Sequence, residues 1–213
     1  MAGRPSKFWQ TCCGIGFIYD QDISRSLNEV RTALEEGADP NSRGGCYNRT
    51  CLMMAVANYS EDLFLDCVVD LLLAQPGIEV NAKDSNGLTA LHIAGAYGNL
   101  ATLKKILAVP GLLLNERDHK GRTPIMLVAS LGKTDAVKMM VAKKGIDLLV
   151  KDNEDKDLEE ACPEFRRNEI VKLLKEAKQK PIIEKVRIAM PHTLPFLHIL
   201  VYLRRFVQTL PEA

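Results

Sequence analysis

The sequence predicts an all-α fold: a solenoid of stacked helix–turn–helix units with projecting turns, followed by a helical C-terminal extension. The first observation behind this prediction is a repeat, since the segment 84–117 returns directly as 118–151. Three landmark pairs keep the same offset, here called the period, namely Asp84 and Asp118, Thr89 and Thr123, and Gly111 and Gly145. Self-similarity with a period in the thirties is typical of repeat proteins. The second observation is that each copy contains two short apolar segments at helical spacing.

Each of these two copies is predicted to be a pair of helices. Thr89 and Thr123 stand before the first apolar segment, where a hydroxyl can accept a hydrogen bond from the first helical turn. The second helix of each copy has apolar residues three or four positions apart. These are Leu100, Leu103, Ile106 and Leu107 in one copy and Ala136, Val137, Met140 and Val141 in the other. Gly111 and Gly145 then suit a left-handed helix terminus.

The two copies resemble the ankyrin repeat, whose pattern is roughly D-x-x-G-x-T-P-L-H-x-A-A-x-x-G, a second helix and G-A-D-V-N. In the first copy the matching residues are Asp84, Gly87, Thr89, Leu91, His92, Ala94, Gly98 and Asn115. In the second they are Asp118, Gly121, Thr123, Pro124, Ala129 and Gly132, with Ile125 and Met126 in place of the usual Leu and His. The resemblance implies an ankyrin-repeat solenoid in which His92 ties neighbouring turns together.

The chain is predicted to contain a capping segment (1–22), a repeat domain (23–178) and an apolar, basic C-terminal extension (179–213). The repeat units are 23–43 (partial), 44–83, 84–117, 118–151 and 152–178 (a degenerate cap). The capping segment should pack on the start of the stack, because it holds the only tryptophan among several large apolar residues. These are Phe8, Trp9, Phe17, Ile18 and Tyr19.

The unit at 44–83 is longer than the others. The interval from Gly37 to Gly77 exceeds the period that separates Gly77, Gly111 and Gly145. Most of the surplus falls around 58–64, where it should bulge between the two helices or lengthen one of them. Insertions in solenoids are usually tolerated surface loops, and a contact with a partner is the alternative.

The unit that begins at Asp152 departs from the pattern. Asp157 stands where other units have threonine, Pro163 interrupts the first helix, and residues 152–160 hold six acidic side chains against one lysine. Its second helix is predicted from apolar residues that follow Phe165 at helical spacing. These are Ile170, Val171, Leu173 and Leu174. A polar terminal unit is what a solenoid needs to stop stacking.

The extension at 179–213 follows no repeat and is too apolar for a disordered tail. It should lie against the last unit, another protein or a membrane surface. Its segment 188–191, Leu194 and the pair Tyr202-Leu203 are similar to the end of a SOCS box, although the Leu-x-x-x-Cys element that binds elongin is not visible upstream. That similarity implies a substrate receptor of a cullin-type ubiquitin ligase. The basic tail and the pair Cys12-Cys13 give a third hypothesis, a membrane-associated adaptor.

No residue pattern predicts catalysis, a cofactor or a metal site. The chain lacks a nucleophile motif, a paired-carboxylate arrangement, zinc-ligand spacing and a dinucleotide fingerprint. A formal net charge of +1 gives no reason to expect nucleic acid as a partner. Six cysteines without metal-ligand spacing and the lack of a signal-peptide pattern predict an intracellular, cytoplasmic protein, with the nucleus left open.

The first hypothesis is therefore a non-catalytic interaction module or adaptor. The ankyrin resemblance implies that a partner lies along the concave face, touching turn tips and the exposed part of each first helix. Carried onto this chain, these positions are Lys83, Ser85, Asn86, Leu88, Ala96, Tyr97, Arg117, His119, Lys120, Arg122, Ser130 and Leu131, with Lys151 next. The cationic tips favour an acidic segment with an apolar anchor, bound chiefly by Tyr97, Arg117 and Arg122. The alternative is an ordinary solvated basic edge. The resemblance also places Asn81 and Asn115 where ankyrin proteins are sometimes hydroxylated.

Overall fold

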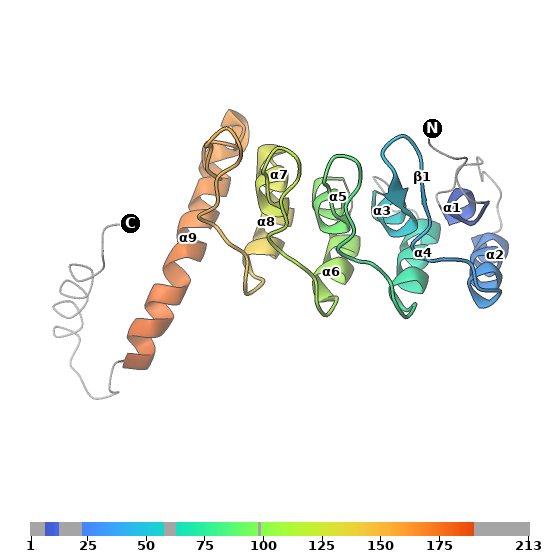
Figure 1. The fold of residues 1–213 in the computed structure, drawn as a ribbon. Coiled ribbons are helices and arrows are strands. Elements are labelled where there is room, and N and C mark those ends of the chain that lie inside the picture. Colours follow the sequence, from blue (N-terminus) through green and yellow to red (C-terminus); the bar gives the residue numbers. More distant parts are fainter. Residues whose placement is uncertain (1–6, 13–22, 58–62, 98, 190–213) are drawn as a thin grey trace, which may run out of the picture. The chain divides into compact units, whose positions relative to one another are not determined.

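The computed structural model describes residues 7–12, 23–57, 63–97 and 99–189 of the 213 (Figure 1). The chain divides into two compact parts, residues 1–171 and 172–213, and the division falls inside the last helix. Several predictions concern positions outside the described residues. They are those for Cys13, Phe17, Ile18 and Tyr19, for residues 58–62 of the bulge, and for the tail from 190 onward.

The first part is a row of helix pairs (Figure 1). The three pairs are α3 (Cys51–Val56) with α4 (Leu63–Leu73), α5 (Ala90–Ala96) with α6 (Leu100–Ala108), and α7 (Pro124–Ser130) with α8 (Thr134–Val141). The first helix of each pair packs on the first helix of the next, so that α5 lies between α3 and α7. The segments 84–117 and 118–151 are therefore neighbouring helix pairs, which confirms the predicted all-helical solenoid.

The core lies between the two helices of each pair and between successive pairs. Among its fully buried side chains are Leu52, Leu72, Leu91, Ile93, Leu103, Ile106, Ile125, Met126 and Met140. Burial of one such side chain stabilises the fold by about 1.5–3 kcal/mol. The predicted apolar faces of α6 and α8 are confirmed except at two positions. Leu100, the first residue of α6, is exposed, and Val141, the last residue of α8, is half-buried.

Two helices and a hairpin precede these pairs. They are α1 (Lys7–Cys12), α2 (Ile23–Glu35) and the antiparallel strands β1 (Arg43–Gly44) and β2 (Arg49–Thr50). Helix α1 packs against α2, α3 and β1. Trp9 is 2% exposed, and its indole N–H donates to the carbonyl of Arg49 at 2.9 Å. The tryptophan is therefore buried against the hairpin, as expected for a residue that covers the start of a stack.

Three asparagines join each repeat to the next one. The side-chain amide of Asn81 donates to the carbonyl of Gly111 at 2.9 Å, and its carbonyl oxygen accepts from the N–H of Leu113 at 2.9 Å. Asn41 and Asn115 make the same pair of bonds to the following repeat. The glycines that receive these amides have positive φ, which for Gly111 is 74°. Each amide thus satisfies two backbone groups of a turn that would otherwise need water.

The fifth repeat has lost its first helix. The described residues from 152 to 163 form turns, with Leu158 and Cys162 buried, and α9 (Glu164–Ala189) begins directly after Pro163. The sequence predicted a first helix interrupted at Pro163, whereas the structure has no helix between residues 152 and 163. Within the part of the chain that the structure describes, no helix has both the length and the apolar character that crossing a bilayer requires.

The threonines predicted to cap first helices differ in what they do. Thr50 accepts from the N–H of Met53 at 3.2 Å, and Thr89 accepts from that of His92 at 3.5 Å. For Thr123 the prediction is wrong, because its side chain makes no capping bond and its buried hydroxyl has no hydrogen-bond partner among the described residues. The two positions also differ three residues on, where a ring nitrogen of His92 lies 2.9 Å from the Thr89 hydroxyl and the repeat at 118–151 has Met126 instead.

Replacing each of the two threonines by valine should therefore have unequal effects. Thr89→Val removes a cap and a buried hydrogen bond, and should lower the free energy of unfolding by about 1–2 kcal/mol. Thr123→Val removes a buried hydroxyl that makes no bond, and should change it by less than about 0.5 kcal/mol or raise it. Urea denaturation of both variants measures the difference, and equal losses would contradict the assignment.

Candidate functional site

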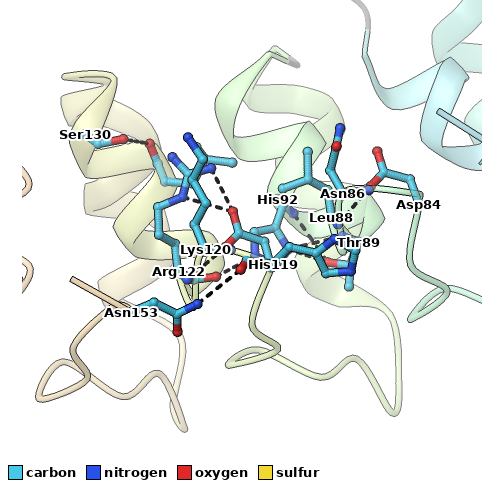
Figure 2. Close-up of polar contacts among 12 residues, drawn as sticks. Asp84, Asn86, Leu88, Thr89, His92, His119, Lys120, Arg122, Ser130 and Asn153 are labelled. Atoms are coloured by element: carbon cyan, nitrogen blue, oxygen red, sulfur yellow. Dashed lines mark hydrogen bonds and ion pairs between the residues drawn. The ribbon is translucent and has the colours of Figure 1, made fainter. Parts of the chain in front are cut away.

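The projecting turns, here called fingers, are closed by aspartates at equivalent positions. The finger at 84–88 is closed by Asp84, that at 118–122 by Asp118 and that at 152–156 by Asp152. In each, one carboxylate oxygen accepts from the backbone N–H groups two and four residues later, at 2.8–3.0 Å. Figure 2 shows the finger at 84–88. Because these bonds are local, the fingers hold their shape before any partner arrives.

Neighbouring fingers are also bonded to one another. The N–H of His119 donates to the carbonyl of Asn86 at 3.0 Å, and that of Ser85 donates to the carbonyl of Tyr47 at 2.8 Å. The approach is close enough to require glycine: a Cβ on Gly87 would lie 2.9 Å from the N–H nitrogen of His119, and the φ of Gly87 is +78°. The tips therefore form a continuous, ordered edge.

His92, in the first turn of α5, connects two of these fingers (Figure 2). Its Nδ1 lies 3.2 Å from the backbone nitrogen of Thr89, and its Nε2 lies 3.1 Å from the carbonyl oxygen of Arg122. The neutral ring with its proton on Nε2 satisfies both, since Nδ1 then accepts and Nε2 donates. Burial lowers the pKa of His92 below 6.5, although the backbone carbonyl of Arg122 and the charge of Asp118 oppose this. The ring therefore ties neighbouring turns together, the role that the family resemblance implies.

Two of the predicted binding cations also hold the stack. The Nζ of Lys83 donates to the carbonyl of Arg117 at 3.0 Å and pairs with Glu116 at 2.7 Å. Arg117 in turn donates to the carbonyl of Lys151 at 2.8 Å. Both residues stay exposed at their outer surface. Their charged groups nevertheless already bind backbone atoms of the next repeat.

Arg122 is committed to its own finger. Its guanidinium lies 2.7 Å from the carboxylate of Asp118, whose side chain is almost fully buried. Burial alone would raise the pKa of Asp118, but hydrogen bonds from the side chain and backbone of Arg122 outweigh it and lower that pKa below its usual value. Arg122 is thus the counter-ion of a buried carboxylate, and a partner would compete with that bond.

Two predicted contact residues are buried and do not belong to the surface. Leu88 is 7% exposed, because it closes the base of its finger, where its carbonyl accepts from the N–H of Asp84 at 2.9 Å. Ala96 is 2% exposed, because it ends α5 between the neighbouring first helices. We therefore remove both from the candidate surface.

The remaining predicted residues do reach solvent. Ser85, Asn86, His119 and Lys120 are exposed at the tips, Leu131 is exposed at the end of α7, and Tyr97 and Ser130 are half-buried. Lys120 differs from the other cations, because within the described part of the chain its ammonium group has no hydrogen bond or ion pair. These residues are the candidate contact surface.

Two exposed aromatic residues were not predicted to take part. Tyr47 is 47% exposed at the tip of the β1–β2 hairpin, with the guanidinium of Arg49 5.1 Å from its ring centre. Phe165 is 79% exposed. Counting in the repeat frame could have found both, since Tyr47 stands three residues before Thr50 as Asn86 does before Thr89, and Phe165 follows Leu131 by one period.

A search of the described residues for His, Cys, Asp and Glu side chains grouped in threes or more as metal ligands finds none. The chain was also compared with known proteins. A family model described as ankyrin repeats in three copies matches residues 23–118, and one described as a single ankyrin repeat matches residues 120–153. Together they cover more than half of the chain. The chain belongs to the ankyrin-repeat family. No curated protein matches it.

Membership of this family gives the protein a general role. Ankyrin repeats are protein–protein interaction modules, and proteins built from them are generally non-catalytic. The family matches end at residue 153, so that the turns from 154 to 163 and helix α9 of this ankyrin-repeat protein lie beyond them.

The buried histidine predicts a pH dependence of stability. The folded state holds the proton of His92 more weakly than the unfolded chain does, so unfolding takes up a proton once the pH is below 6.5. The stabilisation should be complete above pH 6.5 and decrease, by at most about 1.4 kcal/mol per pH unit, as the pH falls toward the lowered pKa.

Urea unfolding between pH 7.5 and 5 should show this slope in the natural sequence and less of it in His92→Gln. His119→Gln, at an exposed tip, is the matched control and should keep the slope. Asp118 does not interfere, because its lowered pKa places its own loss of stabilisation below 3.8. Identical slopes in all three proteins would disprove the assignment to His92.

Proposed function

We propose that the chain is an adaptor that holds a segment of a partner protein along the concave face that its family membership implies. The contact surface consists of the finger tips and the exposed ends of the first helices. The observation that carries the proposal is that hydrogen bonds hold the fingers in place before a partner binds. Their backbone groups are bonded within and between repeats, while their tip side chains face solvent. A surface ordered in advance loses little conformational entropy on binding.

The chemistry of the tips supports an acidic partner segment with an apolar anchor. The ammonium group of Lys120 is unpaired among the described residues, and His119 precedes it. Leu131 of the same repeat and Tyr97 of the repeat before it offer apolar surface. Arg117 and Arg122 are weaker candidates for this contact than the sequence suggested, because both guanidinium groups already have partners within the stack. Lys120 is therefore the cation that we expect to meet the partner's carboxylate.

Charge reversal tests this assignment. Peptides selected from a random display library on the full chain should be rich in acidic and large apolar residues. Lys120→Glu should weaken their binding about tenfold, equal to about 1.4 kcal/mol. Lys104→Glu on α6 is the control, because Lys104 is exposed, whereas its neighbour Lys105 pairs with Asp66 and Asp70 at 2.8 Å. Equal affinities for all three proteins would refute the acidic-partner proposal.

Arg117→Glu should act differently, because its effect begins in the stack. It removes the bond to the carbonyl of Lys151, so the melting temperature should fall along with peptide affinity. A change in affinity at an unchanged melting temperature would show that Arg117 meets the partner directly. Circular dichroism and fluorescence anisotropy on one sample separate the two effects.

The ubiquitin-ligase and membrane hypotheses depend on the extension at 179–213, of which residues 190–213 lie outside the described residues; the membrane hypothesis also uses the pair Cys12-Cys13. Each has a direct test on the full chain. A ligase receptor should co-purify with elongin and lose it when 179–213 is deleted. A membrane-associated adaptor should sediment with anionic vesicles through the same segment. Neither result is expected from an adaptor that acts through its repeats alone.

A further inference from the structure

Three large apolar side chains occupy one position in three consecutive repeats. Tyr97, Leu131 and Phe165 follow each other at intervals of one period. Tyr97 and Leu131 are the first residues after α5 and α7, and Phe165 lies at the start of α9. We call them the apolar stripe. Its exposure rises along the stack, from half-buried Tyr97 through Leu131 at 41% to Phe165 at 79%.

Phe165 continues the stripe in space as well as in sequence. A Cβ placed on Gly132 would lie 3.3 Å from the edge of the Phe165 ring. The ring therefore lies beside the backbone of Gly132, the residue after Leu131. A phenylalanine left this exposed beside another exposed apolar residue is typical of a binding surface.

The residues flanking the stripe are mainly basic. Lys133, two residues after Leu131, is exposed, and its ammonium group has no hydrogen bond or ion pair among the described residues. Arg166 and Arg167 follow Phe165; the first pairs with Glu169 at 3.1 Å and the second donates to the carbonyl of Cys162 at 3.0 Å. Glu164 is the carboxylate next to Phe165. Because the two arginines already have partners, Lys133 is the cation that makes an acidic occupant complementary to the stripe.

The spacing of the stripe selects the conformation of the occupant. Neighbouring packed helices lie about 8–10 Å apart, so Tyr97 and Leu131, at the ends of the packed helices α5 and α7, are separated by about that distance. An α-helix places residues i and i+7 about 10.5 Å apart and on nearly the same face. A β-strand covers about 10 Å in three residues, but i and i+3 then point to opposite faces. A helix can therefore meet Tyr97 and Leu131 from one face and continue toward Phe165, whereas an extended strand turns alternate residues away.

We propose that the apolar stripe binds one α-helix of a partner protein, with large apolar residues at i, i+7 and i+14 and acidic residues on the flank that meets Lys133. This inference rests on the proposed adaptor function and names the form of one of its ligands. It assigns Phe165, outside the family matches, as the outermost anchor.

A pair of peptides tests the proposal. The probe is a helix-stapled peptide of three heptads, with leucine at i, i+7 and i+14 and glutamates on one flank. The control peptide has the same composition, with its leucines at i, i+5 and i+10, so that they do not share a face. Fluorescence anisotropy with the full chain should show that the first binds at least about tenfold more tightly.

Matched protein variants locate the contact. Phe165→Ser should weaken binding of the first peptide about tenfold, while Leu149→Ser should leave it unchanged. Both residues are 79% exposed, so neither substitution removes a buried core side chain. Equal binding of the two peptides, or an unchanged affinity in Phe165→Ser, would overturn the proposal. Self-association of the free chain that Phe165→Ser abolishes would also overturn it, because a second copy would then be the occupant.

The outcome separates this inference from the proposed function. Display-selected acidic peptides that respond to Lys120→Glu, together with a stapled helix that does not bind, would leave the adaptor function standing and reject the stripe. Binding of the stapled helix that Lys120→Glu does not affect, and that Phe165→Ser weakens, would support the stripe without the acidic finger-tip site.

Discussion

The stack depends on side-chain donors that reach from one repeat to the backbone carbonyls of the next. At the turns after the second helices, the donors are the side-chain amides of Asn41, Asn81 and Asn115. Next to the fingers they are Lys83 and Arg117, and in the first turn of α5 it is His92. A repeat of this size cannot bury a sufficient core alone, so its stability lies largely in its interfaces. These bonds between repeats stop after residue 117. One period after Asn115 the chain has Leu149, whose side chain cannot donate. One period after Arg117 it has Lys151, which instead donates to the nearby carboxylate of Asp155 at 2.9 Å. These two changes mark the end of the stack more directly than the acidity of the fifth repeat does.

The same bonds decide which parts of the surface are available to a partner. Lys83 and Arg117 are exposed, yet their charged groups are held by the following repeat, and Arg122 neutralises a buried carboxylate. Breaking such a contact to bind a ligand leaves a backbone carbonyl or a carboxylate without its partner, which opposes binding. Lys120 uses its backbone N–H but, within the described residues, not its side chain, so it has no such cost. Exposure alone is therefore a poor guide to binding residues in a solenoid held together by its charged side chains.

The sequence predicted the units of the fold well, because period and apolar spacing are local properties of the chain. It predicted the exposure of the candidate contact residues less well, because exposure depends on the direction in which a side chain points. Leu88 and Ala96 sit at positions that the repeat pattern places near the surface, but the first points into the base of its finger and the second into a helix interface. Thr123 repeats Thr89 in sequence but lacks the ring nitrogen that His92 supplies. Phe165 was not predicted as a contact residue because Pro163 interrupts the pattern just before it, although the repeat frame continues through both.

The two central repeats differ in how their helices are capped, and this difference decides which repeat a bound partner stabilises most. Both helices of the repeat at 84–117 begin at a bonded cap, Thr89 for α5 and Asn99 for α6. Neither helix of the repeat at 118–151 has a side-chain cap, since Thr123 and Lys133 make no such bond. A missing cap weakens a helix by about 1 kcal/mol, and in a repeat array such losses act on the local unit and its interfaces. The fourth repeat is thus the weaker neighbour of the third. Tyr97 and Phe165 lie in the repeats on either side of the repeat at 118–151. A ligand that contacts both residues binds only while this repeat is folded, so its binding free energy stabilises the repeat that lacks helix caps.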